Sequence, residues 1–165
     1  MLPIIIGNLF SLLAMAADAV GSSRKSVRGV LAMQTLGQAF FAVSAIALKG
    51  YSAAVQNLVS IVRLLFTLSE KRRRYLEALL IALGVALGLY FNNRAWVGLL
   101  PVVGNFEYAL TVFLTKDNER ALKKAFLVKC VLFSVFNVYI YNVVGVASNI
   151  VLICMTAAFL IRDRK

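Results

Sequence analysis

Seven apolar stretches separated by short polar connections fill most of the 165-residue chain. Each stretch has about 17 to 21 residues, which is enough for a helix to cross the ~30 Å hydrocarbon core of a bilayer. The predicted spans are residues 2–20, 30–48, 52–69, 75–91, 95–115, 125–141 and 143–161. This pattern predicts an all-α membrane protein, with seven transmembrane helices in a single domain over residues 1–165.

The boundary between the last two spans has the weakest signal, since only Asn142 and Gly145 mark it. A single helix through both spans would be about 54 Å long, which is too long for the bilayer core. We therefore predict a turn here. The longest connection is predicted at Lys116–Lys124, where charged residues dominate.

Basic residues fall in every second connection. They lie in residues 24–28, 71–74 and 116–124 and in the tail 162–165, whereas the other connections carry only Lys49 and Arg94. Cytoplasmic loops of membrane proteins are enriched in Lys and Arg. The alternation predicts that the N-terminus is outside and the C-terminus inside. Because the first basic cluster follows the first apolar stretch, we expect an uncleaved span there and not a signal peptide.

Composition narrows the functional classes. The chain is 61% hydrophobic with a mean hydropathy of +0.84, which excludes a soluble domain of this size. Its +11 net charge is spread over four connections, which argues against nucleic acid and favours contact with membrane lipids. The chain has no histidine, and Cys130 and Cys154 both lie in apolar stretches, so no metal site or cofactor is expected. With no catalytic Asp dyad or nucleophilic Ser motif, an enzyme is not expected.

A weak internal similarity relates the two halves of the chain. The matching positions are Gly7-Asn8 with Gly104-Asn105, 97 residues apart, and Phe41 with Phe133 and Asn57 with Asn149, both 92 residues apart. We predict two three-helix repeats, residues 1–69 and 95–161, joined by a linker helix over residues 75–91. An odd number of helices per repeat plus one linker gives both repeats the same orientation, so the 3+1+3 repeat is parallel.

Ionisable residues inside the apolar stretches are candidate functional groups, because they are costly in hydrocarbon. We expect Arg63 to pair with Glu107, which lies at a similar depth in the fifth span. Pairing with Asp18, a possible second acid, and snorkelling of Arg63 to the inner headgroups are the alternatives. Glu77 and Lys129 are expected to snorkel from the inner ends of their spans.

Amides suggest a solute site near the middle of the membrane. Asn57 and Asn149 occupy matching places in the two repeats, and an amide can both donate and accept hydrogen bonds without carrying a charge. This favours a neutral polar solute, polyhydroxylated or heterocyclic, with Gln38, Asn105 and Tyr108 as further lining residues. The alternative is that these amides join helices by hydrogen bonds.

Two segments carry a family resemblance. Residues 96–104 (Trp-Val-Gly-Leu-Leu-Pro-Val-Val-Gly) and 56–63 (Gln-Asn-Leu-Val-Ser-Ile-Val-Arg) resemble the YgjV-type bacterial inner-membrane proteins, and the resemblance covers nearly the whole chain. It implies a multi-pass protein of the bacterial inner membrane. Members can carry an Arg late in the last span, where this chain has Met155, so a twofold arrangement of Arg residues is not expected.

The 3+1+3 plan is more distantly similar to the SWEET sugar facilitators and the PnuC vitamin transporters. This resemblance implies that Asn57 and Asn149 line a solute site. SWEET proteins have prolines in the core helices of both repeats, whereas this chain has only Pro3 and Pro101, so a symmetric proline hinge is not expected.

The sequence thus favours a small-solute transporter or facilitator with a midplane site between the repeats. The alternative is a scaffold, sensor or lipid-binding membrane protein with a closed, dry interior sealed by Arg63 and Glu107. A midplane cavity touching both Asn57 and Asn149 distinguishes the two.

Overall fold

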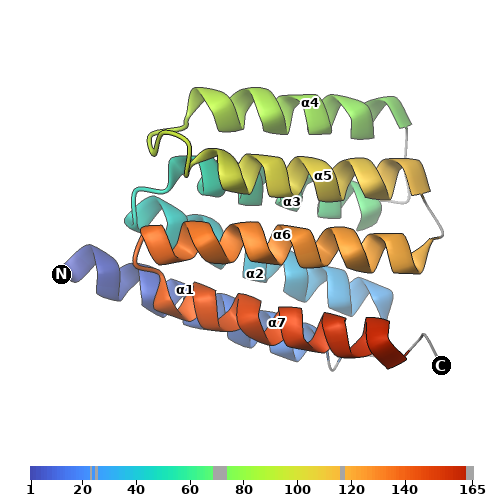
Figure 1. The fold of residues 1–165 in the computed structure, drawn as a ribbon, viewed down its shortest axis with the longest axis horizontal. Coiled ribbons are helices and arrows are strands. Elements are labelled where there is room, and N and C mark those ends of the chain that lie inside the picture. Colours follow the sequence, from blue (N-terminus) through green and yellow to red (C-terminus); the bar gives the residue numbers. More distant parts are fainter. Residues whose placement is uncertain (23, 25, 69–73, 116–117, 163–165) are drawn as a thin grey trace.

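A computed structural model describes residues 1–22, 24, 26–68, 74–115 and 118–162. In these ranges the chain forms seven α-helices and no strands, which confirms the predicted all-α class. The helices are α1 (Leu2–Ser22), α2 (Val27–Ala47), α3 (Tyr51–Leu68), α4 (Arg74–Tyr90), α5 (Leu99–Thr115), α6 (Glu119–Tyr139) and α7 (Val143–Arg162). They run up and down along one direction, with the two termini at opposite ends (Figure 1).

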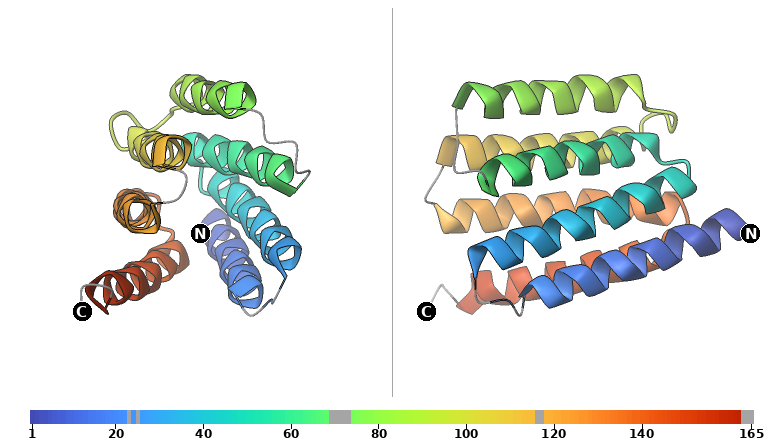
Figure 2. Two further views of the ribbon diagram at one scale, coloured as in Figure 1. Left: turned by 90° about the vertical axis from the view of Figure 1, so that its right-hand side faces the viewer. Right: turned by 180° about the vertical axis from the view of Figure 1, so that it is seen from behind.

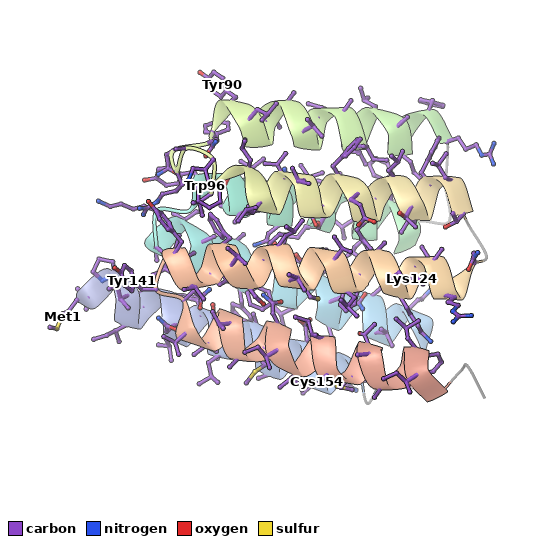
Figure 3. The ribbon with its side chains drawn as sticks, viewed as in Figure 1. Met1, Tyr90, Trp96, Lys124, Tyr141 and Cys154 are labelled. Carbon is purple, nitrogen blue, oxygen red and sulfur yellow. The ribbon has the colours of Figure 1, made fainter. Side chains whose placement is uncertain are left out.

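The two ends of the bundle differ in chemistry. We call the end with the α1–α2, α3–α4 and α5–α6 connections and the C-terminus the basic end, and the opposite end the turn end. Several basic residues behind the orientation argument lie outside the described residues, namely Lys25, Lys71, Arg72, Arg73, Lys116, Arg164 and Lys165. Exposed aromatic side chains gather at the turn end, where Tyr90, Trp96 and Tyr141 project outward, and Lys124 marks the basic end (Figure 3). Aromatic and basic residues at helix ends are typical of membrane–water interfaces.

The outer surface of the bundle is apolar. On α4, Leu79 and Leu89 are each more than half exposed, whereas the buried residues of this helix are Gly84 and Gly88. Within the described residues, three helices are long and apolar enough to cross a membrane, over Leu2–Gly21, Arg28–Ala47 and Val143–Ile161, and shorter apolar helices cover Tyr51–Phe66 and Leu99–Thr115. These features indicate a helical membrane protein, and the seven crossings stay a prediction.

The helices form two layers of three. In the first layer α2 packs between α1 and α3, and in the second layer α6 packs between α5 and α7. Among the described residues, the helix backbones of the two layers approach each other at two seams, α1 against α7 and α3 against α5, while α4 lies outside and covers α3 and α5 (Figure 2, left). In the described part of the chain the backbones of the middle helices α2 and α6 do not approach each other closely. The space between them is where a site can form.

Helix α6 begins earlier than predicted. Asn118 caps its first turn, with Oδ1 accepting a hydrogen bond from the backbone N–H of Ala121 at 3.0 Å. The residues that follow, Glu-Arg-Ala-Leu-Lys-Lys, are good helix formers, so the helix starts at Glu119. The prediction of a loop through residue 124 was therefore wrong. This extension makes Lys129 the central residue of the 21-residue helix.

The predicted turn between the last two spans is present, and it has a counterpart between α2 and α3. Lys49 and Tyr141 have positive φ angles of 56° and 59°. Each follows a helix whose last turn closes with the same two hydrogen bonds, Lys49 N to Ile46 O and Gly50 N to Ala45 O in one turn, Tyr141 N to Val138 O and Asn142 N to Asn137 O in the other. This is the pattern of a Schellman helix ending. Both turns reverse the chain within three residues.

Amide side chains fasten the two seams. At the α1–α7 seam, Asn8 Nδ2 donates to Tyr141 O at 3.0 Å, and its Oδ1 accepts from Val144 N at 3.0 Å. At the α3–α5 seam, Asn105 Nδ2 donates to Gln56 Oε1 at 3.2 Å, and Gln56 Nε2 donates to Gly84 O of α4 at 2.7 Å. Because such bonds satisfy polar groups in an apolar setting, they hold the layers together.

Candidate functional site

A cavity of about 620 Å³ occupies the space between the two layers. All seven helices contribute to its wall, and its volume is in the range of small-molecule sites. Its polar and charged lining residues are Asp18, Gln34, Gln38, Asn57, Ser60, Arg63, Glu77, Tyr108, Lys129, Asn137, Asn142, Ser148 and Asn149. A cavity of this size with polar and charged groups on a largely apolar wall, inside a membrane bundle, is a candidate solute site.

The cavity brings together four of the five predicted solute-site residues, Asn57, Asn149, Gln38 and Tyr108. Asn57 is the seventh residue of α3, and Asn149 is the seventh residue of α7. The two amides therefore lie at the same distance from the turn end, one in each layer. Among the described residues, no hydrogen bond engages either side-chain amide, although Asn57 is only 7% exposed.

The structure places Asn105, the fifth predicted solute-site residue, outside this cavity. Its amide points toward the α3–α5 seam, where it bonds to Gln56 and is 7% exposed. The sequence did not distinguish this role, because helical spacing places Asn105 close to Tyr108 on α5 but does not show which neighbouring helix each side chain meets. Asn105 thus joins helices, as the alternative interpretation of the amides expected.

Charged side chains line the half of the cavity nearer the basic end. Arg63 and Glu77, on the adjacent helices α3 and α4, both line it, and each engages another group of the protein. Asp18 of α1 lines it as well. Glu107, the predicted partner of Arg63, is not among the lining residues, and its Oε2 atom is buried with no hydrogen-bond partner among the described residues. The pairing of Arg63 with Glu107 stays a prediction.

Lys129 was missed as a site residue. We expected it to snorkel from an inner helix end, but the longer α6 places it at the middle of the helix, on the cavity wall. Its Nζ lies 5.2 Å from the ring centroid of Tyr108 and 5.5 Å from that of Phe133. These distances are in the range of cation–π attraction. The signal that could have located it was the helix-forming run at residues 119–124, which moves the helix start.

Aromatic rings also line the cavity wall. Phe41 and Phe133 come from the middle helices of the two layers, and Phe126 and Tyr108 form an edge-on pair with ring centroids 5.9 Å apart. Rings with amides nearby can bind the apolar and polar parts of one small molecule at the same time. Among all the described residues, the cavity wall included, no three His, Cys, Asp or Glu side chains form a group that could hold a metal ion.

An apolar cluster closes the cavity at the turn end. Its buried residues are Ala45, Leu48, Ala53, Ala54, Val97, Phe136 and Ile140. Phe136 is fully buried and lies over Gly50, where a Cβ atom would be 2.9 Å from its ring. The lining continues in the other direction to Gly21, Phe66 and Leu76 near the basic end. The cavity therefore extends from beneath this cluster toward the basic end.

The comparison with protein families decides the class of this molecule. The sequence model of the Imp-YgjV family, described as bacterial inner membrane protein, matches residues 5–165. The chain belongs to this family. Membership in the Imp-YgjV family confirms the resemblance seen in residues 56–63 and 96–104 and identifies a bacterial inner membrane protein. No curated protein and no solved structure matches the chain.

Proposed function

We propose that this protein is a small-solute transporter or facilitator whose binding site is the central cavity. The observation that carries the proposal is that one cavity touches both Asn57 and Asn149. A scaffold with a dry, sealed interior needs no such space, and a protein that uses these amides to join helices would engage them in hydrogen bonds. Their free donors and acceptors suit a neutral polar solute.

The proposed architecture is a parallel 3+1+3 repeat, with residues 1–69 and 95–161 as the units and residues 75–91 as the linker. The two equivalent turns support it, since all their residues are related by an offset of 92. The cavity wall supports it too, because these lining residues come in pairs with that offset: Gln34 and Phe126, Gln38 and Cys130, Phe41 and Phe133, Ala45 and Asn137, Ala53 and Gly145, Asn57 and Asn149, and Ser60 and Leu152.

The seams follow the same relation. Asn8 of α1 bonds to the first turn of α7, and Asn105 of α5 bonds to α3. Because Asn8 and Asn105 are the matched positions at an offset of 97, each unit uses its first helix to hold the third helix of the other. This contact pattern is expected for two units that are related by a twofold axis parallel to the helices.

We further propose seven crossings with the basic end in the cytoplasm, in agreement with the distribution of Lys and Arg. The structure then corresponds to a state closed on the outside by the apolar cluster and accessible from inside. Pro101 is buried at the start of α5, and α1 begins near Pro3, so neither can act as a paired hinge in the middle of both units. Rocking of the units would instead involve the two seams.

A ligand screen tests this function. Purified protein is tested for thermal stabilisation by sugars, nucleosides, vitamins and amino acids, and hits are tested for uptake into proteoliposomes. We expect a ligand that raises the unfolding temperature of the wild type but not of Asn57→Ala or Asn149→Ala. Asn105→Ala is the matched control, because it removes an amide outside the cavity and should keep the ligand response. Binding without uptake, or no binding by any of these classes, would favour the sensor or scaffold.

A further inference from the structure

Two ionisable side chains of opposite charge line the cavity and lie within electrostatic range of each other. Asp18 comes from α1 in the first layer, and Lys129 comes from α6 in the second layer. Among the residues that the structure describes, neither side chain forms a hydrogen bond or an ion pair, whereas Arg63 and Glu77 do engage the protein. Charges inside a membrane protein are energetically costly, and an ionisable residue there is a candidate functional group. These two residues therefore require an explanation.

Asp18 reaches the cavity because α2 leaves room for it. Gly37 is the central residue of the 21-residue helix α2, and a Cβ atom there would lie 3.1 Å from Asp18 Cγ and would collide with Oδ1. The carboxylate thus lies against the middle of α2. Any other residue at position 37 would displace it from this place.

Lys129 occupies the corresponding place on the facing wall. It is the central residue of α6, as Gly37 is of α2, and the two positions differ by the offset of 92 that relates the proposed units. The backbones of α2 and α6 stay apart, and the cavity that Asp18 and Lys129 both line occupies the space between the layers. The rings of Tyr108 and Phe133 flank the lysine and hold its position. The Asp18 carboxylate and the backbone of Lys129 therefore lie at the same depth in opposite layers, and the two charges are close enough to attract each other.

We infer that the solute is a zwitterion of the amino-acid type. This inference rests on the proposed function and names its substrate class. Asp18 would bind the ammonium of the solute, and Lys129 would bind its carboxylate. Asn57 and Asn149, which lie nearer the turn end, would bind a polar group of the solute. A solute with one charge would leave the other protein charge unpaired in a low-dielectric site, which is strongly unfavourable. A zwitterion is neutral overall and pairs both charges.

The experiment compares amino acids with analogues that lack one charge. L-Glutamine, L-threonine and L-phenylalanine are tested against wild-type protein by thermal shift and by proteoliposome uptake. Each is paired with the amine that lacks the carboxylate and the acid that lacks the amino group; for glutamine these are 4-aminobutanamide and glutaramic acid. We expect at least one amino acid to bind and both of its analogues to bind at least tenfold more weakly.

Two variants assign the charges. Asp18→Asn should abolish the preference for the amino acid over the acid that lacks the amino group, and Lys129→Met should abolish the preference over the amine that lacks the carboxylate. Lys124→Gln removes an exposed charge outside the cavity lining and should keep both preferences. The comparison of analogues on the wild type remains informative even if a variant fails to fold.

The outcomes separate this inference from the proposed function. A sugar or nucleoside that binds in an Asn57-dependent way, with no response to any amino acid, would overturn the zwitterion and leave the transporter. Equal binding of an amino acid and its singly charged analogues would also overturn it. If Asp18→Asn and Lys129→Met show coupled effects on stability but none on binding, the two charges serve the fold. Absence of binding and uptake for every class would overturn both proposals.

Discussion

Lys49 and Tyr141 occupy the same position in two turns with identical backbone hydrogen bonds, and both have a left-handed backbone, with φ of 56° and 59°. Both side chains are exposed, so their conformation is imposed by the turn and not by packing of the side chain. A left-handed conformation costs a non-glycine residue about 1–2 kcal/mol. The structure therefore contains strain at two matched positions.

The first prediction concerns this strain. Lys49→Gly and Tyr141→Gly should leave the unfolding temperature unchanged or raise it, because glycine adopts positive φ freely. Lys49→Val and Tyr141→Val should lower it, since a β-branched side chain disfavours this conformation further. Thermal unfolding of the four variants in the same detergent measures the effect. A glycine variant that loses as much stability as its valine counterpart would contradict the assignment of strain.

The second prediction concerns the fastening of α1 to α7. Asn8→Ala removes two hydrogen bonds to backbone groups of Tyr141 and Val144 and should reduce the free energy of unfolding by about 1–2 kcal/mol. Hydrogen exchange of the Val144 amide should become faster, because its N–H loses its acceptor. Asn93→Ala is the control, since it removes a bond to Lys49 O at the other turn and should not change exchange at residue 144.

Close packing of α4 gives the third prediction. A Cβ atom at Gly88 would lie 2.5 Å from Gln56 Nε2 and 2.7 Å from Val102 Cγ2, and Gln56 cannot yield because it is bonded to Gly84 O. Gly88→Ala should therefore destabilise the protein by about 1–3 kcal/mol. At Gly104 the nearest atoms lie 3.5 Å away, which is ordinary contact. Gly104→Ala should be tolerated, and equal losses of thermal stability in both variants would refute the packing of α4.

The fourth prediction concerns access to the cavity. In a background with Cys130 and Cys154 replaced by serine, Ser60→Cys places a thiol on the cavity wall, and Val62→Cys places one on the outer, lipid-facing surface. A membrane-impermeant maleimide should modify position 60 from the cytoplasmic side of inside-out vesicles and not from the other side. Position 62 should resist modification, although Val62 is 39% exposed, because its surroundings lack water. Equal labelling of position 60 from both sides would contradict closure at the turn end.

The sequence predicted the helices well because apolar runs of helical length leave few alternatives in a membrane. It also identified the turn before Val143, where the length limit outweighed the missing turn residues. The predicted connection was wrong at Glu119–Lys124, because the charge of these residues indicates a loop although most of them are strong helix formers. The predicted helix therefore starts too late and has Lys129 near its end, whereas the structure places Lys129 at the centre of α6.

The residues of the site were only partly predictable for a related reason. Helical spacing identifies a face, but it does not say which neighbour that face meets. Asn57 and Asn105 both lie on polar faces, yet one faces the cavity and the other bonds to Gln56. The place of Asp18 depends on Gly37 in another helix, and no pattern within α1 encodes that contact.

The arrangement of the layers, with α1 opposite α7 and α3 opposite α5, limits how this bundle can change shape. In the proposed parallel repeat, an axis along the helices exchanges the two units but leaves each end of the bundle where it is. If the units traded conformations, the same face would open again. If the protein is the transporter proposed above, its outward-open form requires contacts that this structure does not contain, with Phe136 withdrawn from Gly50 and the helix ends near Gly21 and Phe66 drawn together.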